Sequence, residues 1–134
     1  MADPVARACI VPNHSKRFLM ASDGIRLSVD KRKYVTEYVT YAINAPYFRK
    51  QAINNSTGTT RLRIGLSALR KLKILIPSYE EQQKIADIMT TIDQKIEFEK
   101  MKIKKLTDIK KSLMQSLLTG KVRVKVDEDE VTSS

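Results

Sequence analysis

The stretch from Ser78 to Gly120 limits what this chain can fold into more than any other, because it carries the signals of one long helix. Ser78 and Glu81 have the spacing of a capping box, in which each side chain satisfies a backbone N–H of the other residue. Gly120 suits the left-handed conformation that commonly closes a helix, and neither Pro nor Gly interrupts the residues between. We therefore expect a helix of about forty residues, roughly 60 Å long.

This predicted helix carries an apolar seam with a heptad repeat. Its members, apolar except for one Glu and one Lys, are Ile85, Met89, Ile92, Ile96, Glu99, Ile103, Leu106, Lys110, Leu113 and Leu117. Such a seam is typical of helices that pack side by side in a coiled coil. A small domain cannot cover a stripe of this length, so we expect a partner helix to cover it.

The two charged members of the seam, Glu99 and Lys110, indicate the direction of the pairing. In an antiparallel pair of identical helices, Glu99 of one chain can face Lys110 of the other, with the two-fold axis between Lys104 and Lys105. A parallel pair would instead place like charges together in a poorly solvated seam, where they repel. We therefore predict an antiparallel homodimer. The alternative is an exposed break in the seam with no role in register.

The excess positive charge lies before this helix. The net charge is +10, and residues 1–78 carry 14 Lys and Arg against 4 Asp and Glu, whereas residues 79–120 carry 8 against 7. A basic domain joined to a nearly neutral helix favours binding to a polyanion, of which nucleic acid is the usual one. The alternative is a basic domain without such a partner.

Residues 1–77 are predicted to form a small mixed α/β head, so that the fold class of the whole chain is α+β. Alternating and β-branched residues predict short strands at 5–11, 18–20, 25–29, 62–64 and 72–76. Residues 121–134 are expected to form a short strand followed by an acidic, disordered tail.

Helical segments of the head are predicted between these strands. Tyrosines at helical spacing predict a helix over about 37–43, with Thr36 as its N-cap. Pro46 fits the first turn of a second helix that runs to about residue 53, and a helical turn is expected at 67–70.

Two groups of polar and basic residues are candidates for nucleic-acid contacts. They are Lys31, Arg32 and Lys33 in one loop and Thr59, Thr60, Arg61 and Arg63 in another. Lys and Arg bind phosphates, and Arg can also bind guanine; the hydroxyls and backbone N–H groups of a polar loop can bind phosphates as well. Surface loops often have this composition, so the second loop is a weak motif by itself.

Nothing in the sequence predicts an enzyme. His14 and Cys9, the single residues of their types, form no recognisable catalytic or metal-binding pair, and Cys9 is expected to be a small core residue. No phosphate-binding or dinucleotide-binding glycine pattern occurs, so neither a metal nor a cofactor is predicted. A single cysteine excludes an internal disulfide, which fits a reducing cytoplasm. No apolar run approaches ~18 residues, so we expect neither a signal peptide nor a membrane span.

Several short motifs, taken in their order, resemble the specificity subunit of type I restriction–modification systems. They are Thr57-Gly58-Thr59-Thr60-Arg61, Leu72-Lys73-Ile74-Leu75-Ile76-Pro77, Glu81-Gln82-Gln83-Lys84-Ile85 and Leu117-Leu118-Thr119-Gly120. The resemblance implies that residues 1–77 are part of a target recognition domain that normally begins further upstream. Residues 78–120 would be the spacer helix of the family, and residues 121–134 a short strand and tail.

The resemblance implies a non-catalytic subunit that recognises a DNA sequence. It also implies docking of methyltransferase (modification) subunits and, through them, of restriction subunits. A full subunit of that family has two recognition domains and two antiparallel spacer helices, so two copies of this chain would imitate one full subunit. The alternative function is a coiled-coil assembly or inhibitory domain without DNA binding of its own.

Overall fold

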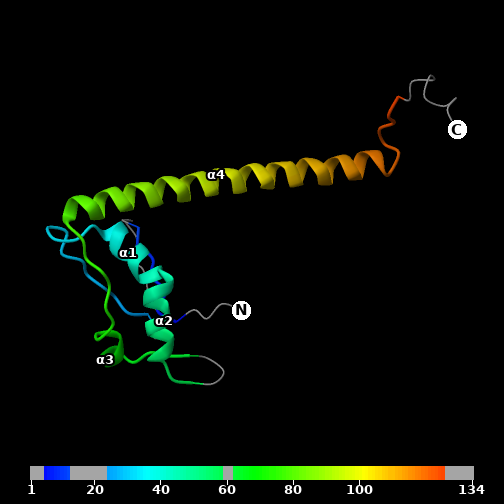
Figure 1. Cartoon of the computed structure of the whole chain (residues 1–134). Helices are drawn as coiled ribbons and strands as arrows, with labels where there is room; N and C mark the ends of the chain where they lie inside the picture. The colour runs from blue at the N-terminus through cyan, green and yellow to red at the C-terminus, as the bar shows by residue number, and fades with distance from the viewer. Residues whose placement is uncertain (1–4, 13–23, 59–61, 126–134) are drawn as a thin grey trace, which may run out of the picture. The chain divides into compact units, whose positions relative to one another are not determined.

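The computed structural model describes residues 5–12, 24–58 and 62–125. The chain divides into two compact units, which we call the head unit (Met1–Thr91) and the helix unit (Ile92–Ser134). The helices are α1 (Thr36–Asn44), α2 (Pro46–Asn54), α3 (Leu66–Leu69) and α4 (Tyr79–Leu117) (Figure 1). Helix α4 begins in the head unit and supplies the helix of the helix unit. No helix in these described ranges is long and apolar enough to cross a membrane.

Helix α4 confirms the long helix predicted from its terminal signals. Ser78 Oγ accepts a hydrogen bond from the Glu81 N–H at 3.3 Å. Among the described residues, the second bond of a capping box, from the Ser78 N–H to the Glu81 carboxylate, does not form. At the other end Gly120 has a φ of +72°, and its N–H donates to the Leu117 carbonyl at 3.2 Å. The helix therefore begins and ends within a few residues of the predicted limits.

Helices α1 and α2 confirm the two helices predicted in the head. Pro46 occupies the first turn of α2, where its missing N–H costs no hydrogen bond. The predicted N-cap of α1 is wrong, because Val35 occupies that position and Thr36 lies inside the first turn. The structure shows the reason: the Val35 N–H donates to the buried side chain of Gln82, at 3.1 Å from Oε1, so a residue of α4 satisfies this end of α1.

The core of the head unit lies between α1 and the first turns of α4. Val35, Tyr38 and Val39 from the α1 side form one buried cluster with Ala86 of α4. The Tyr38 hydroxyl donates to the Leu75 carbonyl at 2.7 Å. Burial, and secondarily the Glu81 carboxylate, raise the pKa of Tyr38 above its ordinary value of 10.0. This core fixes the start of α4 to the residues that precede α1.

The strands predicted for the head do not form in the described residues. Segments 5–11, 25–29, 62–64 and 72–76 carry no strand, and the pairing found there is one isolated antiparallel bridge between Thr57 and Arg63. The described part of the chain is thus mostly helical. The predicted strand at 18–20 lies outside the described residues, as does the acidic tail, and residues 122–125 form no strand.

Amide side chains hold two of these non-strand segments instead of neighbouring strands. The Asn44 side chain accepts from the Ala8 N–H at 3.0 Å and donates to the Ala8 carbonyl at 2.9 Å. Gln51 does the same for the backbone of Lys73, at 3.2 and 2.9 Å. Cys9, next to Ala8, is exposed, so its predicted place in the core is wrong. Within these two segments Val5 is buried and Ile74 packs on the core of the head unit, whereas Ile10, Val11 and Leu75 are exposed.

Candidate nucleic-acid interface and helix seam

The basic turn, residues Asp30–Lys33, is held by its own acidic residue. The Asp30 carboxylate accepts from the Arg32 N–H at 3.1 Å and from Arg32 Nε at 3.2 Å, while the Asp30 carbonyl accepts from the Lys33 N–H at 3.0 Å. The Arg32 side chain is 89 % exposed, so this ion pair contributes little free energy but orients the guanidinium. Lys31 and Lys33 are exposed beside it. The turn therefore presents positive charge on a fixed backbone.

Gln82, in the first turns of α4, ties the basic turn to the long helix. Its side chain is almost fully buried, at 1 % exposure. Its amide donates to the Pro77 carbonyl at 3.0 Å and to the Lys33 carbonyl at 3.4 Å, besides accepting from Val35. The sequence analysis did not single out this residue. The available signal was its position four residues before the buried Ala86, which places both on one face of the helix.

The second candidate loop is described only at its two ends. Thr59, Thr60 and Arg61 lie outside the described residues. The flanking residues Thr57 and Arg63 exchange two backbone hydrogen bonds of 2.9 Å, so the chain enters and leaves the loop at neighbouring points. Arg63 itself is exposed.

The structure does not bring the basic turn and Arg63, the described member of the second group, into one cluster. The basic turn precedes α1, whereas the Thr57–Arg63 bridge follows α2, and Figure 1 shows these positions at opposite ends of the two consecutive helices. A nucleic acid that contacted both would have to extend along the head unit.

No group of three or more His, Cys, Asp or Glu side chains in the described ranges could hold a metal ion, and His14 lies outside those ranges.

The apolar seam of α4 is largely in contact with water. Ile85 is half-buried against the core of the head unit, so the uncovered part of the seam, which we call the exposed seam, runs from Met89 to Leu117. Its apolar members are 38–62 % exposed. Soluble proteins rarely leave a contiguous apolar stripe of this kind without a partner.

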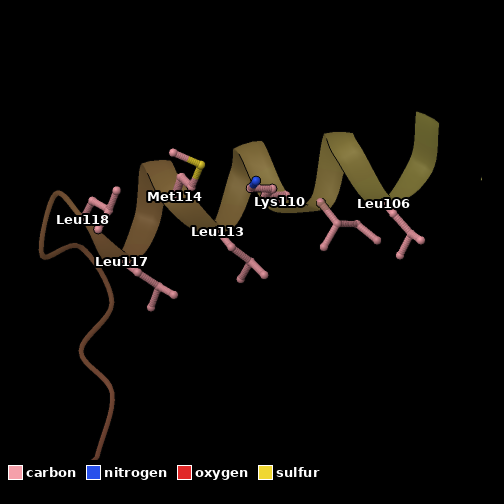
Figure 2. A pocket seen from close by; sticks show the side chains of 7 residues that line it. Leu106, Lys110, Leu113, Met114, Leu117 and Leu118 are labelled. Carbon is pink, nitrogen blue, oxygen red and sulfur yellow. The ribbon is translucent and has the colours of Figure 1, made fainter. Parts of the chain in front are cut away.

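The C-terminal half of the exposed seam forms a shallow apolar hollow. It is lined by Leu106, Ile109, Lys110, Leu113, Met114, Leu117 and Leu118. In Figure 2 the side chains of Leu106, Leu113 and Leu117 project from the same side of the helix. Leucines aligned in this way can accept the side chains of a second helix.

The two charged members of the seam are solvated in the single chain. The Glu99 carboxylate lies 3.8 Å from Lys102 Nζ of the next turn, and both side chains are at least half exposed. Lys110 lines the hollow between Leu106 and Leu113. The structure places both predicted register residues on the uncovered face.

Comparison with known proteins identifies the family of this head and helix. Residues 6–108, which include most of the head unit and most of α4, match the Type I restriction modification DNA specificity domain. The chain therefore belongs to the type I restriction–modification DNA specificity family. Domains of this family recognise DNA and are non-catalytic, in agreement with the absence of any predicted enzymatic site.

Three similar relatives are specificity subunits of Methanocaldococcus jannaschii. The chain is 32% identical over 109 residues to the type I restriction enzyme MjaVIII specificity subunit, covering 81% of this chain and 24% of the relative. The match to the MjaIX specificity subunit is 33% identical and covers 64% and 20%. The putative MjaX specificity subunit is 42% identical over 42% of this chain and 13% of its own length. The chain thus spans a quarter or less of these relatives, and no solved structure matches it.

Proposed function

We propose that this chain is a DNA sequence-recognition and scaffold subunit, or half-subunit, of a type I restriction–modification enzyme. The observation that carries the proposal is the family match, which runs from the head unit into α4 rather than covering one of them alone. The relatives are named as specificity subunits, and the basic charge of residues 1–78 fits a DNA partner. Such a role places the protein in the cytoplasm with the DNA.

In this proposal the basic turn and the polar loop contact the DNA. Lys31, Arg32 and Lys33 bind phosphates, while Thr59, Thr60, Arg61 and Arg63 contact phosphate or base edges. The non-strand segments of the head are the places where strands of a mixed α/β recognition domain would pair.

The exposed seam pairs with that of a second copy in the antiparallel register set by Glu99 and Lys110. In this register Ile103 lies opposite Leu106, Ile96 opposite Leu113, and Ile92 opposite Leu117 of the second copy. All these positions belong to the helix unit, so the pairing does not depend on how the head unit is placed. The pair would imitate the two spacer helices of one full specificity subunit.

The helix unit also docks methyltransferase subunits, which in turn bring restriction subunits to the assembly. This part of the proposal follows from family membership, because the chain itself offers no catalytic constellation. The runner-up function is an assembly or inhibitory domain without DNA binding. The exposed seam supports that function equally well, since it requires only a second helix.

A titration of DNA against the purified chain separates the two functions. We expect binding of a duplex pool of random sequence to weaken steeply with salt, because each neutralised phosphate contributes about 0.9 to the logarithmic slope. Lys31→Ala with Lys33→Ala should lower this slope by about 2, whereas Lys84→Ala, an exposed lysine of α4, serves as the matched control. A dimeric chain that binds no DNA at 50 mM salt would leave only the assembly function.

A further inference from the structure

The outward side of helix α2 carries polar and basic side chains that belong to neither candidate group. Phe48 and Ala52 are buried and mark the side of α2 that packs inward. Tyr47, Lys50 and Asn54 follow one another at spacings of three and four residues on the opposite side. All three are exposed, Tyr47 to 66 %. We call these three residues, together with Lys73, the α2 basic face.

Lys73 joins this face because its backbone is fixed to α2. Gln51 Nε2 donates to the Lys73 carbonyl at 2.9 Å, and the Lys73 N–H donates to Gln51 Oε1 at 3.2 Å. Gln51 follows Lys50 directly and lies one turn after Tyr47, so it borders the outward side of the helix. The Lys73 side chain takes no part in either bond, and Lys73 is exposed. Two lysines from separate parts of the sequence are thus held beside the same side of one helix.

No acidic residue accompanies these cations in the sequence. Between Glu37 and Glu80 the chain has seven Lys and Arg residues but neither Asp nor Glu. Within the described ranges, the side chains of Lys50 and Lys73 form no ion pair. The helix itself does not account for Lys50, which lies in the middle of α2 rather than in the last turn, where a cation stabilises the helix dipole. Cations gathered without counter-ions repel one another, so an anion bound to the α2 basic face would stabilise it.

We propose that the α2 basic face binds the phosphate backbone of duplex DNA without reading its sequence, an assignment that rests on the proposed function. Lysine, tyrosine and asparagine side chains all donate hydrogen bonds to phosphate and sugar oxygens. Lysine is a flexible point charge rather than a planar fork, which favours phosphate over one particular base edge. The face contains no aliphatic side chain, which argues against a protein partner. The Thr57–Arg63 bridge begins three residues after Asn54, so the face continues toward the loop already proposed to contact DNA.

Titration of random-sequence duplexes against the full chain at several salt concentrations tests this site. Lys50→Ala with Lys73→Ala should lower the logarithmic salt slope by about 2, since each phosphate contact contributes about 0.9. The unmodified chain should therefore lose about ten times more affinity than the variant between about 50 and 200 mM salt. Lys50→Arg with Lys73→Arg should keep the slope, because the charges remain, and Lys84→Ala should leave it unchanged. An alanine variant that unfolds at the same temperature as the unmodified chain and keeps its slope would overturn the inference.

Independence from sequence provides the second readout. The double alanine variant should lose affinity by the same factor, within about twofold, for three duplexes of unrelated sequence. A loss confined to one duplex would mean that the face reads bases, and the inference would fail.

Tyr47→Phe removes one uncharged donor from the α2 basic face. It should weaken binding to all three duplexes about two- to tenfold, as expected for one hydrogen bond, and leave the salt slope unchanged. If Lys31→Ala with Lys33→Ala lowers the slope but the α2 variants do not, this inference fails while the proposed function stands. If the unmodified chain binds no DNA, both fail.

Discussion

Replacing the buried Gln82 with leucine should destabilise the head unit through three backbone groups at once. In the variant the Val35 N–H loses its acceptor, and the carbonyls of Pro77 and Lys33 lose a donor. The Val35 contact is buried, so its loss costs the penalty of an unsatisfied donor, ~1–3 kcal/mol. The two carbonyls are part-buried and recover some of their loss from water.

The apolar leucine side chain offsets part of this cost. The two carbonyls together add about 1 kcal/mol to the loss, and burial of the leucine side chain returns about 1 kcal/mol, which leaves a net destabilisation of roughly 1–3 kcal/mol. For a unit of this size such a change lowers the melting temperature by ~10 °C. Urea and thermal unfolding of the full chain at one fixed concentration measure it, since the proposed pairing of copies would make stability depend on concentration.

The neighbouring Gln83 provides the matched control for this experiment. Its side chain is exposed and makes one hydrogen bond, from Nε2 to the Asp87 carboxylate at 3.0 Å. Gln83→Leu should therefore change the unfolding free energy by less than about 0.5 kcal/mol. If Gln82→Leu unfolds at the same urea concentration as the unmodified chain, the argument that this amide joins α4 to the basic turn is wrong.

Three further predictions follow from single contacts or charges. Because the pKa of Tyr38 is raised in the folded chain, its contribution to stability is constant below pH 10 and falls as the pH rises from 10 through the folded-state pKa. Tyr38→Phe should remove this fall. Urea unfolding of the two proteins at pH 9 and at pH 11 measures the difference. Lys110→Glu alone should weaken self-association in sedimentation equilibrium, whereas Lys110→Glu combined with Glu99→Lys should restore it, and indifference to both changes would refute the register. Arg61→Ala with Arg63→Ala should weaken DNA binding by a few kcal/mol at most, and an unchanged titration would remove that loop from the interface.

The long helix could be predicted from sequence because its signals are local. Ser78, Gly120 and the uninterrupted residues between them act within one or two turns of the backbone, and the structure confirms both ends. The same holds for Pro46 at the start of α2. Local signals of this kind do not depend on what the rest of the chain does.

The sequence could not show that the predicted strands are missing from the described residues, because strand formation depends on residues far away in sequence. Alternation at 25–29 is compatible with a half-buried strand, but a strand also needs a neighbour to bond its backbone. In the described residues Asn44 and Gln51 bond such segments instead, and no periodicity marks those amides as backbone ligands. The structural role of Gln82 was missed for the same reason, since its three partners lie outside its own helix.

The candidate interface and the seam, too, could be predicted in part from local sequence. The basic turn was identified by composition, and the structure shows the Asp30 contacts that fix it. The seam was identified by its period, and the structure adds that its first member, Ile85, already packs on the head core. Neither period nor composition could show that the basic turn and the Thr57–Arg63 bridge lie at opposite ends of the consecutive helices α1 and α2.

The central claim is that the exposed seam is covered by an identical helix running in the opposite direction. A spin label at Gln115→Cys, in a chain with Cys9→Ser, tests it through the distance between the two labels in the associated protein. With the two-fold axis between Lys104 and Lys105, the antiparallel register predicts a separation of roughly 30 Å along the helices. A parallel pair would give a separation of only about 10–20 Å, set by the spacing of the two helices. That shorter distance, or the absence of any label–label distance because the chain stays monomeric, would contradict the account.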